Sequence, residues 1–187
     1  MHILIVHQVF ITPKEGGGTR HYEFAKFLVK QGYRVTVLAS QVDYATGKLR
    51  SCEFETLEGI NIHYVPALKG VNKSIFFRAL SFLYFAIRSY RVGIQVQDVD
   101  LLWATSPPLF QVYTAYRIAK RKRVKWLFEV RDLWLDFAKQ LGVVKNPAIL
   151  FVFKQLEKRM YKKADFLMVN SPGFLPHLRR VTQKPVI

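Results

Sequence analysis

The sequence predicts an α/β protein with a Rossmann-like, mostly parallel sheet and helices on both faces. Six short apolar runs recur along the chain with helix-length segments between most of them, and several of these runs are apolar without alternation. Such runs are typical of strands buried on both faces, and their spacing calls for right-handed crossovers between parallel strands. With 187 residues, 50% of them hydrophobic, the chain is long enough for one sizeable core. We therefore expect a single domain over residues 1–187.

The expected elements follow from these runs and from residues that favour helix ends. We expect strands at residues 3–6, 34–39, 60–66, 101–105, 126–130 and 166–170. A first helix is expected from about residue 18 to residue 31, because Gly32 can adopt the left-handed conformation that ends a helix. Asn146 and Pro147 are residue types preferred at an N-cap and a first helical position, so a later helix is expected from here to Lys163.

A glycine-rich turn follows the first expected strand and opens the first helix. It reads Gly16-Gly17-Gly18-Thr19-Arg20, without the G-x-G-x-x-G spacing of a dinucleotide site or the Gly-Lys-Ser/Thr of a Walker loop. Adjacent glycines let a ligand approach the backbone closely, and a helix N-terminus and an arginine both favour an anion. The turn is a candidate phosphate contact, and a flexible connection between strand and helix is the alternative.

Two further loops carry polar groups at the carboxyl ends of expected strands, where ligands bind in such sheets. Glu129 and Arg131 share one face of their strand, where they can form a salt bridge, and Asp132 follows in the loop. Asp132 can accept a hydrogen bond or a proton from a substrate hydroxyl, or it can cap the next helix. Ser106, in a loop stiffened by two prolines, can bind a sugar hydroxyl or act as a cap.

The charge balance favours an anionic partner. Lys and Arg number 29 against 13 Asp and Glu, a formal net charge of +16, and the basic residues are bunched at 120–125, 154–163 and 179–180. This charge attracts nucleic acid, anionic lipid headgroups or phosphorylated substrates, unless the clusters are only solvated faces. A single cysteine excludes an intramolecular disulfide, and the five histidines show no metal-ligand spacing, so no metal is expected. The first residues lack the pattern of a secretory signal, so we expect a protein that is not exported.

Residues 73–92 are too apolar for an ordinary surface helix. At 100° per residue one stripe holds Ser74, Arg78, Ser81 and Arg88, and the rest of the circumference is largely hydrophobic or aromatic. A membrane span needs about 20 apolar residues, so it is not expected here. The segment can be a core helix, an interfacial helix on an anionic membrane, or both on opposite sides. The residues expected at the membrane are Phe76, Phe77, Phe82, Phe85, Arg78 and Arg88.

The order of these motifs resembles the N-terminal domain of family 4 retaining glycosyltransferases, which have the GT-B fold. It is most similar to the branch that includes fucosaminyl transferases of polysaccharide and O-antigen synthesis. The matching stretches span nearly the whole chain and read IVHQVF, GGGTRHYEFAKFL, YATGKL, LLWATSPPL, FEVRDLW and LEKRMYKKADFLMVNSPG. The resemblance implies transfer of a sugar from a nucleotide-diphospho-sugar to an acceptor, with retained anomeric configuration and without a catalytic metal or other cofactor.

The resemblance also implies roles for particular residues. The N-terminal domain of this family mainly holds the acceptor, and the C-terminal domain holds the nucleotide. Gly17 and Gly18 would border the donor diphosphate across the cleft, and Arg20 would help to neutralise it or an acceptor phosphate. The implied acceptor pocket is lined by Ser106, Glu129 and Arg131. Asp132 would lie nearest the reacting hydroxyl and is the implied catalytic residue.

The remaining expectations concern partners. The donor is expected to be UDP-linked, and the acceptor to be an oligosaccharide or a polyprenyl-diphosphate-linked sugar at the cytoplasmic face of the cell membrane. There the enzyme would be a peripheral protein on an anionic surface. The second Rossmann-like domain of the family, with its P-x-G pattern and acidic E-x7-E motif, is absent from residues 1–187. We therefore expect this chain alone to be inactive.

Three rival functions use the same features. A basic nucleic-acid-binding or membrane-binding domain without catalysis explains the charge, but no helix-turn-helix, zinc finger or RNP-like motif is present, and no nucleic acid is expected as a partner. A nicotinamide-dependent oxidoreductase needs an acidic residue after the second strand, where the chain has Ala39-Ser40-Gln41. A lipid-binding scaffold would bind bare lipid and not a lipid-linked sugar.

Overall fold

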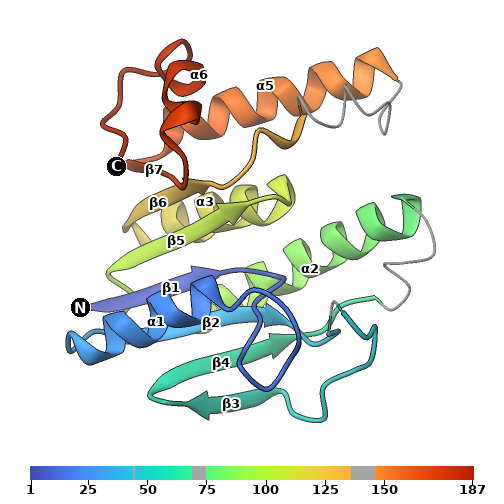
Figure 1. Cartoon of the computed structure of the whole chain (residues 1–187), viewed down its shortest axis with the longest axis vertical. Helices are drawn as coiled ribbons and strands as arrows, with labels where there is room; N and C mark the ends of the chain where they lie inside the picture. The colour runs from blue at the N-terminus through green and yellow to red at the C-terminus, as the bar shows by residue number, and fades with distance from the viewer. Residues whose placement is uncertain (44, 69–74, 136–145) are drawn as a thin grey trace.

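The fold is built on a seven-stranded sheet (Figure 1). The computed structural model describes residues 1–43, 45–68, 75–135 and 146–187. Across the sheet the strand order is β3-β4-β2-β1-β5-β6-β7, and each neighbouring pair is parallel except β3 with β4. The strands are β1 (His2–Val6), β2 (Arg34–Ser40), β3 (Phe54–Leu57), β4 (Ile60–Val65), β5 (Leu101–Ser106), β6 (Lys125–Val130) and β7 (Phe166–Val169). The prediction of an α/β, mostly parallel sheet is confirmed.

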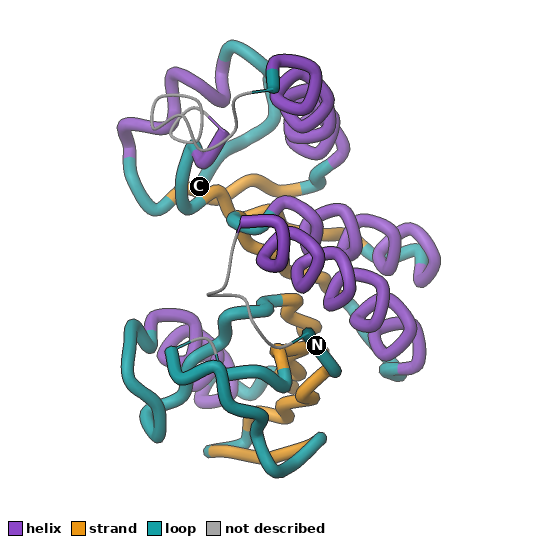
Figure 2. The backbone as a smooth tube through the Cα atoms, turned by 90° about the vertical axis from the view of Figure 1, so that its right-hand side faces the viewer, coloured by secondary structure: helices purple, strands orange, loops and turns teal. Residues whose placement is uncertain are grey.

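Helices cover both faces of this sheet, as predicted. Helix α1 lies on one face, and α2, α3 and α5 lie on the other (Figure 2). The helices are α1 (Arg20–Lys30), α2 (Ile75–Gln95), α3 (Leu109–Lys122), α5 (Pro147–Lys163), η1 (Pro172–Phe174) and α6 (Leu175–Arg179). Among the described residues, no helix is long and apolar enough to cross a membrane.

Each face of the sheet has a hydrophobic core of its own. On β1, Leu4 and Val6 belong to the core beneath α2, α3 and α5, whereas Ile3 and Ile5 belong to the core beneath α1. Both cores exclude water, so successive residues of the strand are buried and its sequence shows no polar alternation. This double burial is the physical reason that the apolar runs predicted the strands correctly.

The ends of the first and later helices follow the expected capping residues. Helix α1 starts at Arg20, two residues later than expected, and Gly32 follows it with a positive φ of 82°. The Asn146 side chain accepts a hydrogen bond from the Ala148 backbone N–H at 2.9 Å, and the helix ends at Lys163. The expected cap and length of this helix are confirmed.

One strand was not predicted from the sequence. The edge strand β3 pairs antiparallel with β4 through a tight turn at Glu58 and Gly59, which both have positive φ. Because β3 is only half buried, its four residues carry no apolar run, and Phe54 is exposed. The strand expected at 60–66 ends at Val65, before Pro66.

Helix α2 has its small side chains toward the protein. Ser81 and Ser89 are fully buried, and Gly93 approaches α3 so closely that a Cβ there would lie 2.5 Å from the Ile118 Cδ1. Ser81, a member of the polar stripe noted in the sequence, therefore faces the protein, because small residues let the helix pack closely. Phe85 is also fully buried, which corrects its expected place at a membrane. Ser74 and the Phe76 side chain lie outside what the structure describes.

The strand order places a switch point between β1 and β5. From β1 the chain builds outward to β2 and β4 on one side, and through β5, β6 and β7 on the other. In open parallel sheets the crevice for ligands lies outside the carboxyl ends of the strands at this point. The loops after β1, β5 and β6 are therefore the expected position of a ligand-binding site.

Candidate functional site at the carboxyl edge of the sheet

A row of polar side chains crosses β1, β5 and β6 at their carboxyl ends. Ile5 pairs with Trp103 and Thr105 pairs with Glu129, so His7, two residues beyond Ile5, continues the same row on the α1 side. The three residues of this polar row, His7, Thr105 and Glu129, are all buried. Burying polar groups in an otherwise apolar sheet costs free energy unless they form hydrogen bonds. The hydrogen-bond partners of each residue therefore indicate whether it is structural or can bind a ligand.

Glu129 is held by the first two residues of α1. Its Oε1 forms an ion pair with the Arg20 Nη1 at 2.6 Å, and its Oε2 lies 2.7 Å from the His21 Nε2 and accepts a hydrogen bond from the Trp103 Nε1 at 3.2 Å. Burial alone would raise the pKa of Glu129, but the His21 hydrogen bond and the Arg20 charge outweigh it and lower this pKa. The predicted salt bridge between Glu129 and Arg131 is therefore wrong, because Glu129 pairs with Arg20.

The His7 ring packs against the His21 ring, and His7 is neutral. The two imidazole rings are 4.2 Å apart between centroids, and burial, followed by the nearby His21, lowers the pKa of His7 well below its ordinary value. Within the described residues, neither the His7 Nδ1 nor the Thr105 Oγ1 has a hydrogen-bond partner in the protein. Two buried polar atoms of one row thus lack a hydrogen-bond partner among the described residues.

Arg131 holds the loop after β5 in place. Its Nη2 donates to the Pro107 carbonyl at 2.9 Å and its backbone N–H donates to the Ser106 carbonyl at 3.2 Å. Burial lowers the pKa of Arg131, while Glu129 and Asp132 oppose this shift. The Ser106 side chain is largely buried, and Asp132 is exposed in the loop after β6. The structure therefore brings Ser106, Arg131 and Asp132 together, with Arg131 acting on the loop backbone.

The glycine-rich turn lies at the same edge and is open to solvent. Gly17 has a φ of 132°, and a Cβ on it would lie 2.8 Å from the Ile11 Cδ1, so this position requires glycine. Gly18 has open space around its Cα. The Arg20 guanidinium lies 5.0 Å from the Phe24 ring centroid and pairs with Glu129, so part of its charge is already balanced.

Two site residues were missed in the sequence, His7 and His21. The five histidines have no metal-ligand spacing in the sequence, and within the described residues no three His, Cys, Asp or Glu side chains are grouped to hold a metal. The usable signal was that His7 ends a buried strand and His21 opens the helix that covers it. Tyr44, in the motif at 44–49, lies outside the described residues.

Comparison with known proteins settles the family. The chain matches the glycosyl transferase 4-like domain over residues 15–185. The chain belongs to this family. The resemblance predicted from the motifs is thereby confirmed at the level of a family 4 glycosyltransferase domain. No curated protein sequence matches the chain.

Larger solved proteins share the fold of this glycosyl transferase 4-like domain. A sucrose-phosphate synthase from Thermosynechococcus elongatus has a TM-score of 0.70 at 15% identity and aligns with 100% of the chain and 47% of its own length. A UGT transferase from Siraitia grosvenorii in complex with UDP has a TM-score of 0.54 at 14% identity, covering 96% of the chain and 47% of its own. The chain spans about half of each protein. It therefore has the fold of the N-terminal half of a GT-B glycosyltransferase.

The lowered pKa of His7 predicts how the stability of this domain depends on pH. We expect the free energy of unfolding to fall as the pH is lowered from about 7 to 5. Folded His7 stays neutral, whereas unfolded His7 gains a proton below its ordinary pKa of 6.5, so acid favours the unfolded state. One such group contributes at most about 1.4 kcal/mol per pH unit. Urea unfolding at several pH values should show a shallower dependence for His7→Gln, and an unchanged slope would contradict the assignment.

Proposed function

We propose that the chain is the acceptor-binding domain of a retaining glycosyltransferase. In this proposal the enzyme transfers a hexose or an amino sugar from a nucleotide-diphospho-sugar to a glycan acceptor. A second domain holds the nucleotide, so the chain alone has no transferase activity. The family match and the GT-B fold support the reaction class.

The polar row at the switch point is the observation that carries this proposal. A buried polar atom without a partner costs about 1–3 kcal/mol, and the row contains two such atoms, the His7 Nδ1 and the Thr105 Oγ1. A sugar hydroxyl both donates and accepts, so it can complete a neutral imidazole and a threonine hydroxyl together. Ser106 is buried at the same edge and Asp132 is exposed there, where Asp132 can accept a hydrogen bond from the reacting hydroxyl.

The donor is proposed to lie across the glycine-rich turn. Gly17 and Gly18 let a diphosphate approach the backbone, and Arg20 has a half-exposed guanidinium at the start of α1. We propose a UDP-linked donor and a reaction without a metal or other cofactor. Among family members, we place the chain in the fucosaminyl transferase branch of polysaccharide synthesis, on the motifs quoted above.

The acceptor is proposed to be linked to a polyprenyl diphosphate and to reach the enzyme at the cytoplasmic face of the cell membrane. The net charge of +16 supports an anionic surface as a partner. Helix α2 supports the same idea, because Phe77 is exposed and no acidic residue occurs along the helix. Phe82, Arg78 and Arg88 are half-buried on this helix.

Binding of an acceptor analogue to this chain tests the proposal. Farnesyl-diphosphate-linked N-acetylglucosamine is titrated into the chain, and the imidazole proton NMR signals of the histidines are followed. We expect saturable shifts for His7 and His21, which lie at the carboxyl edge. His63 on β4 is the internal control, because its ring packs against Phe54 at the far edge of the sheet.

A parallel titration with UDP separates the two domains of the proposed enzyme. We expect little or no heat in calorimetry with this chain, because the main nucleotide site belongs to the second domain. Micromolar binding of UDP would overturn the assignment of this chain as the acceptor half. Shifts confined to His63, or no shift with the acceptor analogue, would remove the polar row as the acceptor site.

A further inference from the structure

Along helices α2, α3 and α5, exposed apolar side chains come before exposed basic side chains. Each helix begins at the carboxyl edge of the sheet and runs back toward the amino edge (Figure 1). Exposed apolar or aromatic side chains lie toward the start and are Leu80, Leu83 and Ile87 on α2, Tyr113 on α3, and Ile149, Phe151 and Val152 on α5. Exposed basic side chains lie toward the end and are Arg91 on α2, Arg117, Lys120 and Arg121 on α3, and Arg159, Lys162 and Lys163 on α5. Ile94 of α2 departs from this order, and the exposed Lys154 of α5 lies near the middle of its helix.

The three helices form one layer. Helix α3 packs between α2 and α5, and the Phe110 ring of α3 meets the Phe153 ring of α5 with centroids 5.5 Å apart. We call the outer side of this layer the three-helix face. Ser81, Ser89 and Gly93 of α2 face inward together with Phe85, whereas several other large apolar residues of that helix, such as Leu83 and Ile87, are exposed to solvent. This is the reverse of an ordinary amphipathic surface helix, and it indicates that the face meets something apolar.

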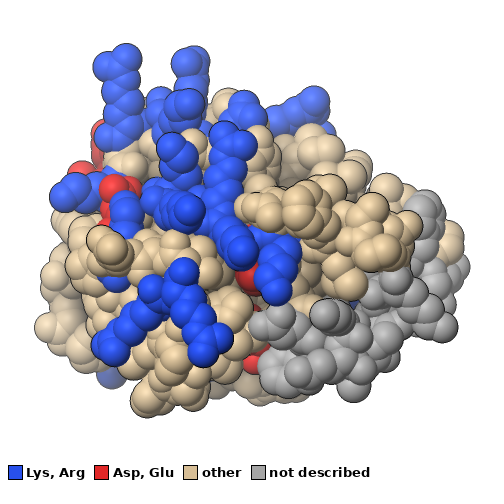
Figure 3. All heavy atoms as spheres, turned by 90° about the horizontal axis from the view of Figure 1, so that it is seen from above, with Lys and Arg blue, Asp and Glu red and all other residues tan. Residues whose placement is uncertain are grey.

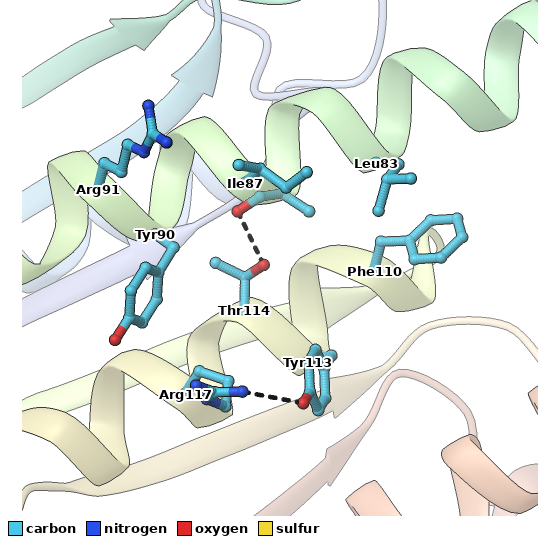
Figure 4. A pocket seen from close by; sticks show the side chains of 9 residues that line it. Leu83, Ile87, Tyr90, Arg91, Phe110, Tyr113, Thr114 and Arg117 are labelled. Atoms are coloured by element: carbon cyan, nitrogen blue, oxygen red, sulfur yellow. Dashed lines mark hydrogen bonds between the residues drawn. The ribbon is translucent and has the colours of Figure 1, made fainter.

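An apolar groove runs between α2 and α3 on this face (Figure 4). It has a volume of about 260 Å³ and is lined by Leu83, Ala86, Ile87, Tyr90, Arg91, Phe110, Tyr113, Thr114 and Arg117. At its basic end the Arg117 Nη1 donates to the Tyr113 hydroxyl at 3.2 Å, and the guanidinium lies 5.9 Å from the Tyr90 ring centroid. The groove thus joins an apolar floor to a cationic end.

The charge of the face is almost entirely positive. Helices α2 and α3 contain no acidic residue, and Glu157, the one acid of α5, is buried. Seen from above, over α5, Lys and Arg crowd one part of the surface with few acidic groups among them, and an uncharged region lies beside them (Figure 3). A second copy of the chain would bring the same positive charge and be repelled. A nucleic acid would match the charge but leave the apolar half without a partner.

We infer that the three-helix face docks on an anionic lipid bilayer. The apolar starts of the helices and the groove enter the boundary between headgroups and acyl chains, and the basic ends contact anionic headgroups. Because the apolar starts lie at the carboxyl edge, docking turns toward the bilayer the edge of the sheet that carries His7, Thr105 and Glu129, with these residues on the α1 side of the sheet. This inference rests on the proposed function, because the orientation serves catalysis only if the acceptor is linked to a lipid.

Vesicle binding tests the apolar half of the face. The chain is floated with vesicles of phosphatidylglycerol and phosphatidylcholine, and with phosphatidylcholine alone as the neutral case. We expect the chain to bind the anionic vesicles, and Leu83→Ser with Ile87→Ser to weaken binding at least about tenfold. These side chains are 43% and 52% exposed, so the substitutions leave the core intact. Phe27→Ser is the matched control, because Phe27 is 58% exposed on α1, on the other face of the sheet.

A second pair of variants tests the basic half. Lys120→Gln with Arg121→Gln should weaken binding to anionic vesicles by about 10- to 30-fold, and this loss should shrink as salt is raised. Lys30→Gln with Lys48→Gln removes the same charge from exposed positions outside the three-helix face. If both pairs weaken binding equally, only the net charge matters and the face is not the docking surface.

Other outcomes identify other occupants. Self-association in light scattering that Leu83→Ser with Ile87→Ser abolishes, without vesicle binding, would replace the bilayer by a second copy. Binding of duplex RNA without binding of anionic vesicles would assign the basic residues to nucleic acid. The acceptor titration uses a soluble analogue in the absence of vesicles. Docking without acceptor binding would therefore contradict the proposed function, and acceptor binding without docking would contradict this inference.

Discussion

Glu129→Ala is expected to lower the free energy of unfolding by about 3–5 kcal/mol. The carboxylate is fully buried and is the common partner of Arg20, His21 and Trp103. Removing the carboxylate leaves His21 and Trp103 buried without this partner and leaves the half-exposed Arg20 without its counter-charge, which costs more than the cluster contributes as a whole. The measurement is urea unfolding followed by circular dichroism at pH 7.

Two comparisons decide whether this loss comes from the cluster. Glu23→Ala removes an exposed carboxylate from the same helix end and should change stability by no more than about 0.5 kcal/mol. Glu129→Gln keeps the shape and should fall between Glu129→Ala and the natural chain. A loss below about 1 kcal/mol for Glu129→Ala would mean that Arg20 and His21 do not depend on this carboxylate.

The acid dependence of stability gives a separate readout of Glu129. Its lowered pKa means that the charged form is favoured by folding, so the contribution is complete above the ordinary glutamate value of 4.5. That contribution is lost as the pH falls below 4.5 through the lowered pKa. Glu129→Gln should therefore lose less stability than the natural chain over this acid range.

The fold was predictable because its strands are buried on both faces. Leu4 and Ile5 face different cores, so the sequence of β1 is apolar throughout and identifies a strand of a parallel sheet. Strand β3 was not predictable in the same way, since it is a half-exposed edge strand whose place depends on pairing with β4. The orientation of α2 was not predictable either, because the sequence of a helix rich in apolar residues does not indicate which side faces solvent. Packing of Ser81 and Gly93 against the protein decides that side.

The candidate site was predictable as a place but not as a set of contacts. Parallel topology brings the loops after β1, β5 and β6 together, and the sequence alone located Ser106, Arg131 and Asp132 there. The partners depend on tertiary packing. Arg20 and Glu129 are more than a hundred residues apart and meet only because α1 begins at the carboxyl edge of the sheet, where the Arg20 side chain reaches the Glu129 carboxylate. Spacing along one strand suggested Arg131 as the partner and had no means to find Arg20.

Asp132→Asn is expected to lower the turnover of the proposed two-domain enzyme by about 100- to 10,000-fold, the range for a group that receives a proton in the transition state. Asp132 is exposed at the carboxyl edge beside Arg131, whose contacts with Pro107 hold the facing loop. Asparagine keeps the size of this side chain but does not accept a proton. Initial rates of sugar transfer to a farnesyl-diphosphate-linked acceptor provide the measurement.

The matched control for Asp132→Asn lies at the opposite edge of the sheet. Asp98 is exposed there in a left-handed conformation that asparagine also tolerates, and its ion pair with Arg34 is exposed to solvent. Asp98→Asn should therefore leave turnover and stability nearly unchanged. A large fall in turnover for Asp132→Asn, with an unchanged free energy of unfolding, assigns the loss to the reaction and not to the fold. Turnover within about twofold of the natural enzyme would remove Asp132 from the chemistry, and the acceptor hydroxyl would then need another proton acceptor at this edge, for which the neutral His7 is the buried candidate.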